Sequence, residues 1–191
     1  MYSGGLDSLG MLYKLLTEED YRGYGVHVHH IHISNVEQRA RAEAITVKIA
    51  LEELRRLGFN FGFSESSIAA PAFNHKFMFD MDAVRFFAGY LCQVNPEIKL
   101  VAVGANATEF GPDMQRRRVR ANAILAAFTP VETIYPVGAL QKREIFAVLP
   151  PTLRDKFWSC RTPVYSETNI KFCGRCNTRV GPPHLVQYSL S

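Results

Sequence analysis

A short glycine-containing segment near the start of the chain has the residue types of an anion-binding loop. It consists of Ser3, Gly4, Gly5, Leu6, Asp7 and Ser8, and a helical pattern of leucines follows it. Two glycines allow the backbone to turn tightly and bring its N–H groups close to an oxyanion, and the helix dipole adds a positive end. Asp7 fits such a site if a Mg²⁺ ion lies between its carboxylate and a polyphosphate. The simpler alternative is a glycine turn with a Ser or Asp helix cap.

Three of the four cysteines form a second candidate site in the C-terminal part of the chain. Cys173 and Cys176 are separated by two residues, a spacing at which two thiolates can grip one metal ion, and Cys160 supplies a third sulfur. A domain of this size needs no disulfides, and the clustering favours a metal site in a reducing compartment. We therefore expect a bound Zn²⁺ ion, although three free thiols remain the alternative. Cys92 lies in an apolar helical pattern and is expected in the core.

Other polar patterns receive simpler interpretations. Histidines alternate between the two faces of one expected strand, and we interpret them as polar residues with satisfied hydrogen bonds; they are His27, His29, His30 and His32. Arg39 and Glu43, four positions apart, are predicted to form an ion pair on a helix surface. The arginines at positions 116, 117, 118 and 120 are typical of a solvated helix face, unless one of them meets an anionic substrate.

Composition and charge exclude several classes of protein. The 191 residues are 47% hydrophobic and 21% charged, which is ordinary for a globular domain and excludes disordered, collagen-like and coiled-coil chains. No apolar run approaches the ~18 residues of a membrane helix, and no secretory signal is visible, so we expect no membrane partner and a cytoplasmic location. A net charge of +4 is compatible with anionic ligands but too weak to predict stable nucleic-acid binding.

Hydrophobic periodicity predicts that strands alternate with helices along most of the chain. We expect a helix directly after Ser8, and strands over residues 24–33, 59–63, 98–103 and 133–135. Further helices are expected from Asn35 to before Gly58, from Asp80 or Asp82 onward, and over 116–128 and 141–149, with a loop over 64–76. This order predicts an α/β fold with a parallel sheet and helices on both faces. Ligands bind such sheets beyond the carboxyl ends of the strands, here at residues 3–8, 33–35 and 104–108.

Both candidate sites resemble one enzyme family. Residues 3–8 match the pyrophosphate loop of the N-type ATP pyrophosphatases, the PP-loop family, and the Walker A pattern is absent. The cysteine tail, from Trp158-Ser159-Cys160 to Cys173-Gly174-Arg175-Cys176, resembles that of the 7-cyano-7-deazaguanine synthases within this family. Weaker resemblances are the lysine before a Glu-Ile helix in 136–145, the strand-end turn 104–107, and Pro112-Asp113 followed by Arg116.

The resemblance implies a fold, a reaction and a set of cofactors. The fold would be Rossmann-like, of the adenine nucleotide alpha hydrolase or HUP type, with a PP-loop ATP pyrophosphatase domain over 1–150 and a small cysteine-rich zinc-binding tail over 151–191. The reaction would use ATP and Mg²⁺ to adenylate the carboxylate of 7-carboxy-7-deazaguanine, and ammonia would then lead to 7-cyano-7-deazaguanine. Such an enzyme belongs to the biosynthesis of queuosine or of modified DNA, and we expect a homodimer.

The resemblance also assigns residues to roles. ATP would be bound by the loop residues Ser3, Gly4, Gly5, Leu6, Asp7 and Ser8, together with His32, Ile33 and Gly104. Catalysis would involve Asp7, Ser8 and Lys142, and the substrate would meet Asn106, Asp113 and Arg116. Zinc would be held by Cys160, Cys173, Cys176 and His184; His184 substitutes for the fourth cysteine of the family, where Arg179 stands, and a weak or vacant site is the alternative.

Besides Arg179, the sequence departs from the family at three further places. Only Met1 and Tyr2 precede the loop, where the family has its central strand, so we expect this first strand to be truncated by a late or internal start. The tyrosine and cysteine of the family's substrate segment are missing around Asp113, and its Pro-Ala-Arg-Asn segment is not recognisable. These departures suit a phage-encoded homologue acting in a host cytoplasm. They also keep two alternatives open: a PP-loop enzyme that modifies tRNA, and a degenerate nucleotide-binding protein without turnover.

Overall fold

The computed structural model describes residues 1–69, 80–176 and 188–189. The α-helices in this part of the chain are α1 (Leu6–Thr17), α2 (Ala40–Arg56), α3 (Asp80–Val94), α4 (Pro112–Ala126) and α5 (Lys142–Val148). The strands are β1 (His27–Ser34), β2 (Gly62–Ala69), β3 (Leu100–Ala102), β4 (Glu132–Ile134), β5 (Val164–Tyr165), β6 (Asn169–Lys171) and β7 (Tyr188–Ser189). None of these helices is long and apolar enough to cross a membrane.

The predicted parallel pairing is confirmed, but it is divided between two small sheets. β1 pairs in parallel with β2 from His27 opposite Gly62 to Ser34 opposite Ala69. β3 pairs in parallel with β4, and the described residues contain no direct strand pairing between the two sheets. The loop predicted over 64–76 is wrong for its first part, because β2 continues to Ala69. The histidines of β1 explain this: His27 and His29 both hydrogen-bond the Ser64 hydroxyl, so polar residues extend the strand.

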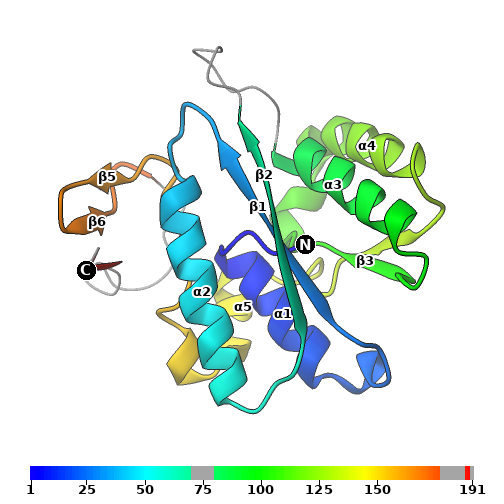
Figure 1. Ribbon diagram of the computed structural model, residues 1–191, viewed down its shortest axis with the longest axis horizontal. Helices are drawn as coiled ribbons and strands as arrows, with labels where there is room; N and C mark the ends of the chain where they lie inside the picture. The colour runs from blue at the N-terminus through cyan, green and yellow to red at the C-terminus, as the bar shows by residue number, and fades with distance from the viewer. Residues whose placement is uncertain (70–79, 177–187, 190–191) are drawn as a thin grey trace.

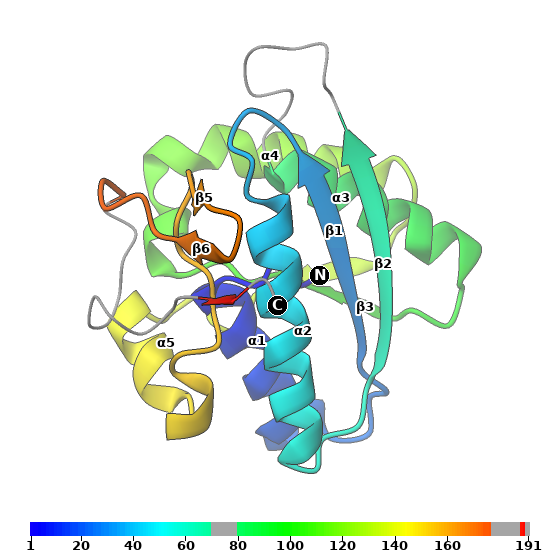
Figure 2. The ribbon, with the colours of Figure 1, turned by 60° about the vertical axis from the view of Figure 1, so that its left-hand side comes forward.

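Helices cover the strands from two sides. α1, α2 and α5 lie on one side of the strands, and α3 and α4 lie together on the other (Figure 1, Figure 2). One core cluster joins Leu9 and Leu12 of α1 to Leu51 of α2 and Ile145 of α5. A second joins α3, β3 and α4, and it includes Cys92, as expected. The chain is therefore a mixed α/β protein with small parallel sheets. β1 is buried on both faces, whereas β2 has no buried residue and alternate residues along it are exposed.

α1 begins at Leu6, inside the segment predicted as a turn, and two further helices also begin at other residues than the sequence predicted. α2 begins at Ala40, because the Asn35 side chain accepts a hydrogen bond from Glu37 N and forms a turn instead of a helix cap. Gln38 follows in this turn with a positive φ of 52°. α4 begins at Pro112, since proline suits the first helical turn, where its missing N–H has no partner to lose.

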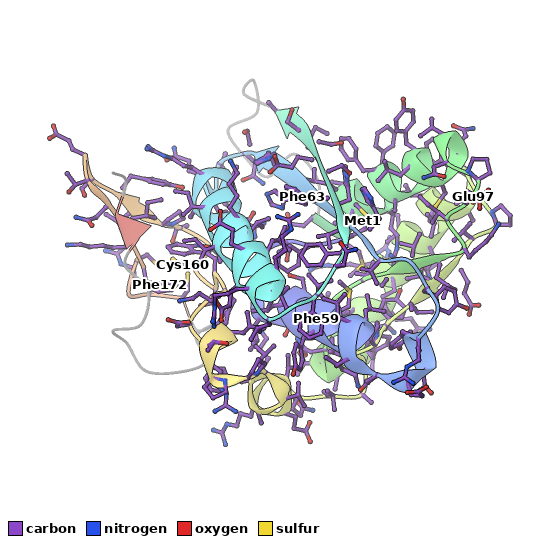
Figure 3. All side chains as sticks on the ribbon, turned by 60° about the horizontal axis from the view of Figure 1, so that its bottom comes forward. Met1, Phe59, Phe63, Glu97, Cys160 and Phe172 are labelled. Atoms are coloured by element: carbon purple, nitrogen blue, oxygen red, sulfur yellow. The ribbon has the colours of Figure 1, made fainter. Side chains whose placement is uncertain are left out.

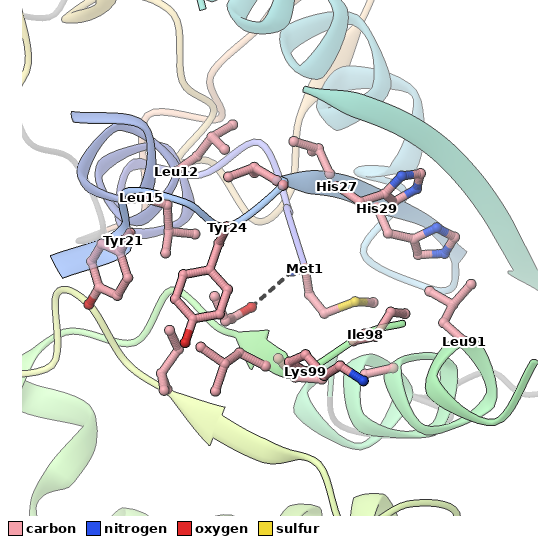
Figure 4. A pocket seen from close by; sticks show the side chains of 18 of the residues that line it. Met1, Leu12, Leu15, Tyr21, Tyr24, His27, His29, Leu91, Ile98 and Lys99 are labelled. Atoms are coloured by element: carbon pink, nitrogen blue, oxygen red, sulfur yellow. Dashed lines mark hydrogen bonds between the residues drawn. The ribbon is translucent and has the colours of Figure 1, made fainter. Parts of the chain in front are cut away.

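Met1 and Tyr2 lie between the two parallel sheets and connect them. Tyr2 N donates to His29 O of β1 (2.8 Å), and the Met1 amino group donates to Ala102 O of β3 (2.9 Å). A cavity of about 550 Å³ lies beside Met1 and is lined by residues of β1, β3, α1 and α3 (Figure 4). Burial, reinforced by Arg85, lowers the pKa of the Met1 amino group to about 5. Met1 and Tyr2 thus bridge β1 and β3, and the cavity lies beside them.

The C-terminal segment forms a third, antiparallel sheet of order β5–β6–β7. It is joined to the helical layer by a small core in which Trp158, Cys160 and Ile170 pack with Ala42 of α2. Cys160 and Phe172 lie close together beside α2, whereas Met1 and Glu97 lie on the other side of that helix (Figure 3). The cysteine cluster is therefore part of a segment packed directly against α2.

Candidate functional site

The glycine loop is held in shape by hydrogen bonds within itself. Gly4 has a φ of +78°, a conformation that favours glycine. Ser8 Oγ donates to Gly5 O (2.9 Å) and lies 3.1 Å from Ser3 Oγ. Ser8 is buried, so its hydroxyl serves the loop in this structure, whereas Ser3 is exposed. The tight turn predicted from the two glycines is present, and it leads directly into α1.

The N-terminus of α1 has no side-chain cap and packs against the turn after β3. The helix begins at Leu6, and its N-cap residue, Gly5, supplies no side-chain cap. The first turn of any α-helix leaves its N–H groups without helical partners. Gly104 approaches this turn so closely that a Cβ there would lie 2.6 Å from Ser8 N and 2.7 Å from Asp7 C. Glycine at position 104 therefore keeps the strand-end turn from covering the helix N-terminus.

Asp7 is the point at which three predicted segments meet. Asn106 Nδ2, from the turn after β3, donates to Asp7 Oδ2 (2.9 Å). Lys142 Nζ, from the start of α5, lies 4.0 Å from the same oxygen. The other oxygen, Oδ1, is buried and has no hydrogen-bond partner among the described residues. Because hard cations prefer carboxylate oxygens, this unsatisfied oxygen fits the predicted Mg²⁺ ligand.

Asn106 and Lys142 are themselves positioned by local structure. Asn106 Oδ1 accepts from Thr108 N (2.9 Å), so the side chain caps the following short helix while its amide group reaches Asp7. Lys142 is the first residue of α5, which begins with a reciprocal capping box between Gln141 and Glu144. Glu109, beside Asn106, has its pKa raised by burial and by the nearby Asp7. Asn106 was assigned to the substrate by resemblance, and here it contacts Asp7.

No described contact joins the remaining predicted ligand residues to Asp7. His32 and Ile33 lie near the carboxyl end of β1, and His32 Nε2 is 3.1 Å from Glu65 Oε1 of β2. Asp113 and Arg116 lie in the first turns of α4, where Arg116 is exposed. The side chain of Asp113 lies outside the described part of the structure. Among the described contacts, none joins Arg116 to the glycine loop.

Arg39 is a site residue that sequence reasoning placed wrongly on the surface. Its guanidinium is only 15% exposed and contacts the carboxylates of Glu37 (2.6 Å), Glu43 (2.7 Å) and Asp80. Burial and the neighbouring carboxylates Asp80 and Glu37 raise the pKa of Glu43 to about 7, although Arg39 opposes this. Gly4 packs on the same turn of α2, since a Cβ there would lie 3.3 Å from Glu43 O. The i, i+4 spacing correctly predicted the pair but not its burial beside the loop.

The three tail cysteines converge as the sequence predicted. The sulfurs of Cys160, Cys173 and Cys176 all lie within 4.8 Å of one another. Cys176 Sγ is 3.9 Å from Cys160 Sγ and 3.3 Å from Cys173 Sγ. A Zn–S bond of ~2.3 Å in a tetrahedron places sulfurs roughly 3.8 Å apart, so a metal such as zinc fits this cluster with little movement. The fourth predicted ligand, His184, and Arg179 lie outside the described residues.

Backbone N–H groups donate to all three of these sulfurs, and Cys160 Sγ accepts from Cys173 N (3.3 Å). Cys173 Sγ accepts from Arg175 N (3.4 Å), and Cys176 Sγ accepts from Arg161 N (3.4 Å). Hydrogen bonds from Thr162 and from the Arg175 backbone lower the pKa of Cys173 to about 6. Burial raises the pKa of Cys160 to about 11. A metal ion would have to displace that proton, as metal binding to thiols ordinarily does.

Comparisons with family models, with curated proteins and with solved structures gave no match for this chain. Any function must therefore be inferred from the residues of the two sites themselves.

Proposed function

We propose that the protein is an ATP-dependent enzyme of the PP-loop type that activates a carboxylate by adenylation. The observation that carries this proposal is the meeting of Asn106 and Lys142 at Asp7, beside the uncapped N-terminus of α1. The three segments come from distant parts of the sequence. Each was singled out from the sequence for a role toward ATP, its metal ion or the substrate. A glycine turn that binds no ligand does not require a lysine and a carboxylate oxygen without a hydrogen-bond partner beside it, as found here with Lys142 and Asp7 Oδ1.

The proposed substrates are 7-carboxy-7-deazaguanine, ammonia and ATP, on the strength of the family resemblance. A carboxylate oxygen of the substrate attacks the α-phosphorus of ATP, the bond to the β-phosphate breaks, and pyrophosphate leaves. Ammonia then attacks the acyl carbon, AMP leaves with the bonding electrons, and the nitrogen loses a proton to give the amide. A second adenylation, on the amide oxygen, followed by loss of AMP and two protons, gives the nitrile.

The residues of the loop serve the leaving pyrophosphate. Negative charge accumulates on the β-phosphate oxygen as it departs, and N–H groups aimed at that position stabilise it. Leu6, Asp7 and Ser8 would supply these N–H groups from the first turn of α1. Lys142 adds a positive charge on a flexible side chain, which is 37% exposed and therefore able to reach toward solvent. Asp7 would hold Mg²⁺, which when bound supplies further neutralisation of the phosphate charge.

The cysteine tail has a structural role in this proposal. Its sulfurs belong to a buried cluster on the outer side of α2, and they would hold zinc in a closed site without reacting. We propose that the tail, from its position beside α2, organises the part of the site that binds the substrate. Arg161, next to Cys160, reaches Glu37 (3.4 Å) at the turn before α2, so the tail contacts the same turn as Arg39.

The proposal is tested by pyrophosphate release from ATP. Purified protein with Mg²⁺ is supplied with 7-carboxy-7-deazaguanine and ammonium, singly and together, and the expected result is release that requires the acid. Asp7→Asn is expected to abolish turnover. The asparagine preserves the shape of the side chain, but its neutral amide no longer holds a cation. ATP binding without release in any combination would instead identify a nucleotide-binding protein without turnover. Release that depends on added tRNA would identify the tRNA-modifying alternative.

A further inference from the structure

One residue, Trp158, contacts both the glycine loop and the cysteine cluster. Its backbone N–H donates to Gly4 O (2.8 Å), and its indole Nε1 donates to Cys160 O (2.7 Å). Its ring stacks on Phe172 with centroids 4.6 Å apart and planes at 11°. Phe172 directly precedes Cys173, and Trp158 is only 4% exposed. The two candidate sites are therefore joined through one buried aromatic side chain and its own backbone.

Gly4 is fixed from the opposite side by α2. A Cβ at Gly4 would lie 3.1 Å from the Val47 side chain and 3.3 Å from Glu43 O, so the loop has no room to move toward that helix. The Trp158 carbonyl lies on the loop as well, at 3.6 Å from the Cβ position of Gly5. The loop is thus held between α2 and Trp158, and a displacement of Trp158 must change the direction of the Gly4 peptide.

Other contacts between the C-terminal segment and the rest of the protein are made outside the glycine loop. The Arg161 guanidinium pairs with Glu37, and the Tyr165 hydroxyl donates to Gln38 O, both in the turn that precedes α2. These contacts hold the tail in place whether or not the cysteines carry a metal ion. Trp158 differs from them because its backbone N–H also reaches the glycine loop itself, at Gly4 O.

We propose that Trp158 is a positioning residue that couples metal binding at Cys160, Cys173 and Cys176 to anion binding at residues 4–8. This inference rests on the proposed function of the loop. Cys160 and Cys173 are linked by hydrogen bonds, among them one from Cys173 N to Cys160 Sγ (3.3 Å). A metal ion bonded to all three sulfurs fixes the Cys160 carbonyl and Phe172 relative to each other. Trp158, which contacts both, then holds Gly4 in the conformation that directs the α1 N–H groups outward.

Linkage makes the coupling reciprocal. If metal binding favours the anion-binding conformation of the loop, then an anion in the loop must strengthen metal binding by the same factor. Couplings between sites in one protein typically change affinity about 5- to 150-fold. The path here consists of one stacked pair and two hydrogen bonds, so we expect a change of roughly tenfold.

The experiment uses the full chain with zinc as the metal and inorganic pyrophosphate with Mg²⁺ as the anion. Pyrophosphate affinity is measured by calorimetry in zinc-loaded and chelator-treated protein, and zinc affinity is measured with and without pyrophosphate. Amide hydrogen exchange at residues 4–8 reports the loop directly. Trp158 is the single tryptophan of the chain, so its fluorescence follows zinc binding at the cluster. The expected result is about tenfold tighter pyrophosphate binding, and slower exchange at residues 4–8, in the zinc-loaded form.

A pair of matched variants separates coupling from general destabilisation. Phe172→Leu removes the stacking partner of Trp158 but no cysteine and no loop residue. Phe86→Leu makes the same change on α3, where Phe86 contacts Phe87 and Phe128. With zinc bound, Phe172→Leu is expected to exchange faster at residues 4–8 and to lose the reciprocal effect of pyrophosphate on zinc affinity. Phe86→Leu is expected to keep both properties of the wild type.

The outcomes distinguish this inference from the proposed function. Equal pyrophosphate affinity and equal exchange at residues 4–8 in both zinc states would overturn the coupling and leave the proposed function standing. Slower loop exchange with zinc, but no pyrophosphate binding in either form, would support the positioning role of Trp158 and contradict the proposed function. Failure of the protein to bind zinc at all, or wild-type behaviour of Phe172→Leu, would also overturn the inference.

Discussion

Replacement of Gly104 by alanine tests whether the strand-end turn must stay clear of the α1 N-terminus. The added Cβ would lie 2.6 Å from Ser8 N, 2.6 Å from Ser8 Cα and 2.7 Å from Asp7 C. All three are backbone atoms of the first helical turn, so no flexible side chain can move aside. The turn after β3 and the start of α1 must separate, or the Ser8 N–H must be covered.

The magnitude follows from these contacts. Forcing an extra methyl group into a packed region typically costs 1–3 kcal/mol of stability. For a chain of this length, ~1 kcal/mol lowers the midpoint of thermal unfolding by roughly 2–4 °C. A hydrogen bond to a charged group contributes about 1.5–3 kcal/mol. Covering the Ser8 N–H should therefore weaken pyrophosphate binding by roughly 10- to 150-fold, since ~1.4 kcal/mol corresponds to a factor of ten.

The assay is pyrophosphate binding by calorimetry together with thermal unfolding. Gly25→Ala is the matched control, because a Cβ at Gly25 meets no atom within 4 Å. The control should keep wild-type affinity and stability to within a few tenths of a kcal/mol, as is typical of surface substitutions. If Gly104→Ala binds pyrophosphate as tightly as the wild type while unfolding at the same temperature, the close packing of this turn on the loop is not a requirement of the site.

Three further predictions concern other parts of the structure. Asn106→Leu should weaken Mg²⁺-dependent pyrophosphate binding, because Asp7 loses the amide donor that orients it; calorimetry showing unchanged affinity would contradict this. Elemental analysis of protein never exposed to chelator should find about one zinc per chain, and finding none would contradict the metal role of Cys160, Cys173 and Cys176. Burial lowers the pKa of His29 to about 4, so the folded protein keeps it neutral and loses up to about 3 kcal/mol of stability as pH falls from 6.5 to 4. In denaturant titrations His29→Gln should flatten that part of the pH profile, and an unchanged slope would refute the assignment.

The alternation of strands and helices could be predicted because the hydrophobic periods are local. The leucines of α1 and the apolar stripe of α2 recur at helical spacing, and both helices formed close to the predicted residues. The extent of β2 could not be predicted in the same way. Its residues 64–67 read Ser-Glu-Ser-Ser, which is typical of a loop, yet they pair with residues 29–32 of β1, where His29 hydrogen-bonds Ser64 and His32 Nε2 lies 3.1 Å from Glu65 Oε1. Hydrogen bonding between strands that are distant in sequence overrode local propensity here.

The meeting at Asp7 could be anticipated from sequence only through the order of the elements. In a parallel arrangement, the turn after β3 and the start of α1 lie at the same edge, so Gly104 and Asp7 were expected near each other. The contact of Asn106 with Asp7 follows from how that residue caps the next short helix, which periodicity does not reveal. The convergence of the cysteines was more secure, because a two-residue separation constrains both sulfurs regardless of the surrounding fold.

The Arg39 cluster shows why a correct local pattern can still mislead. Spacing identified Arg39 and Glu43 as partners, and an exposed pair of that kind contributes only about 0.3–0.5 kcal/mol. In the fold, Asp80 arrives from the start of α3 and Glu37 from the turn before α2, so one guanidinium serves three carboxylates in a mostly buried place. Burial is the main cause of the raised pKa of Glu43, and the carboxylates of Asp80 and Glu37 add to it; at about 7, this pKa would leave the carboxyl partly protonated near neutral pH. Gly4 packs against the backbone of Glu43, so this charged cluster lies next to the glycine loop. Residues 39 and 80 are far apart in the sequence, and no local pattern predicts that they meet.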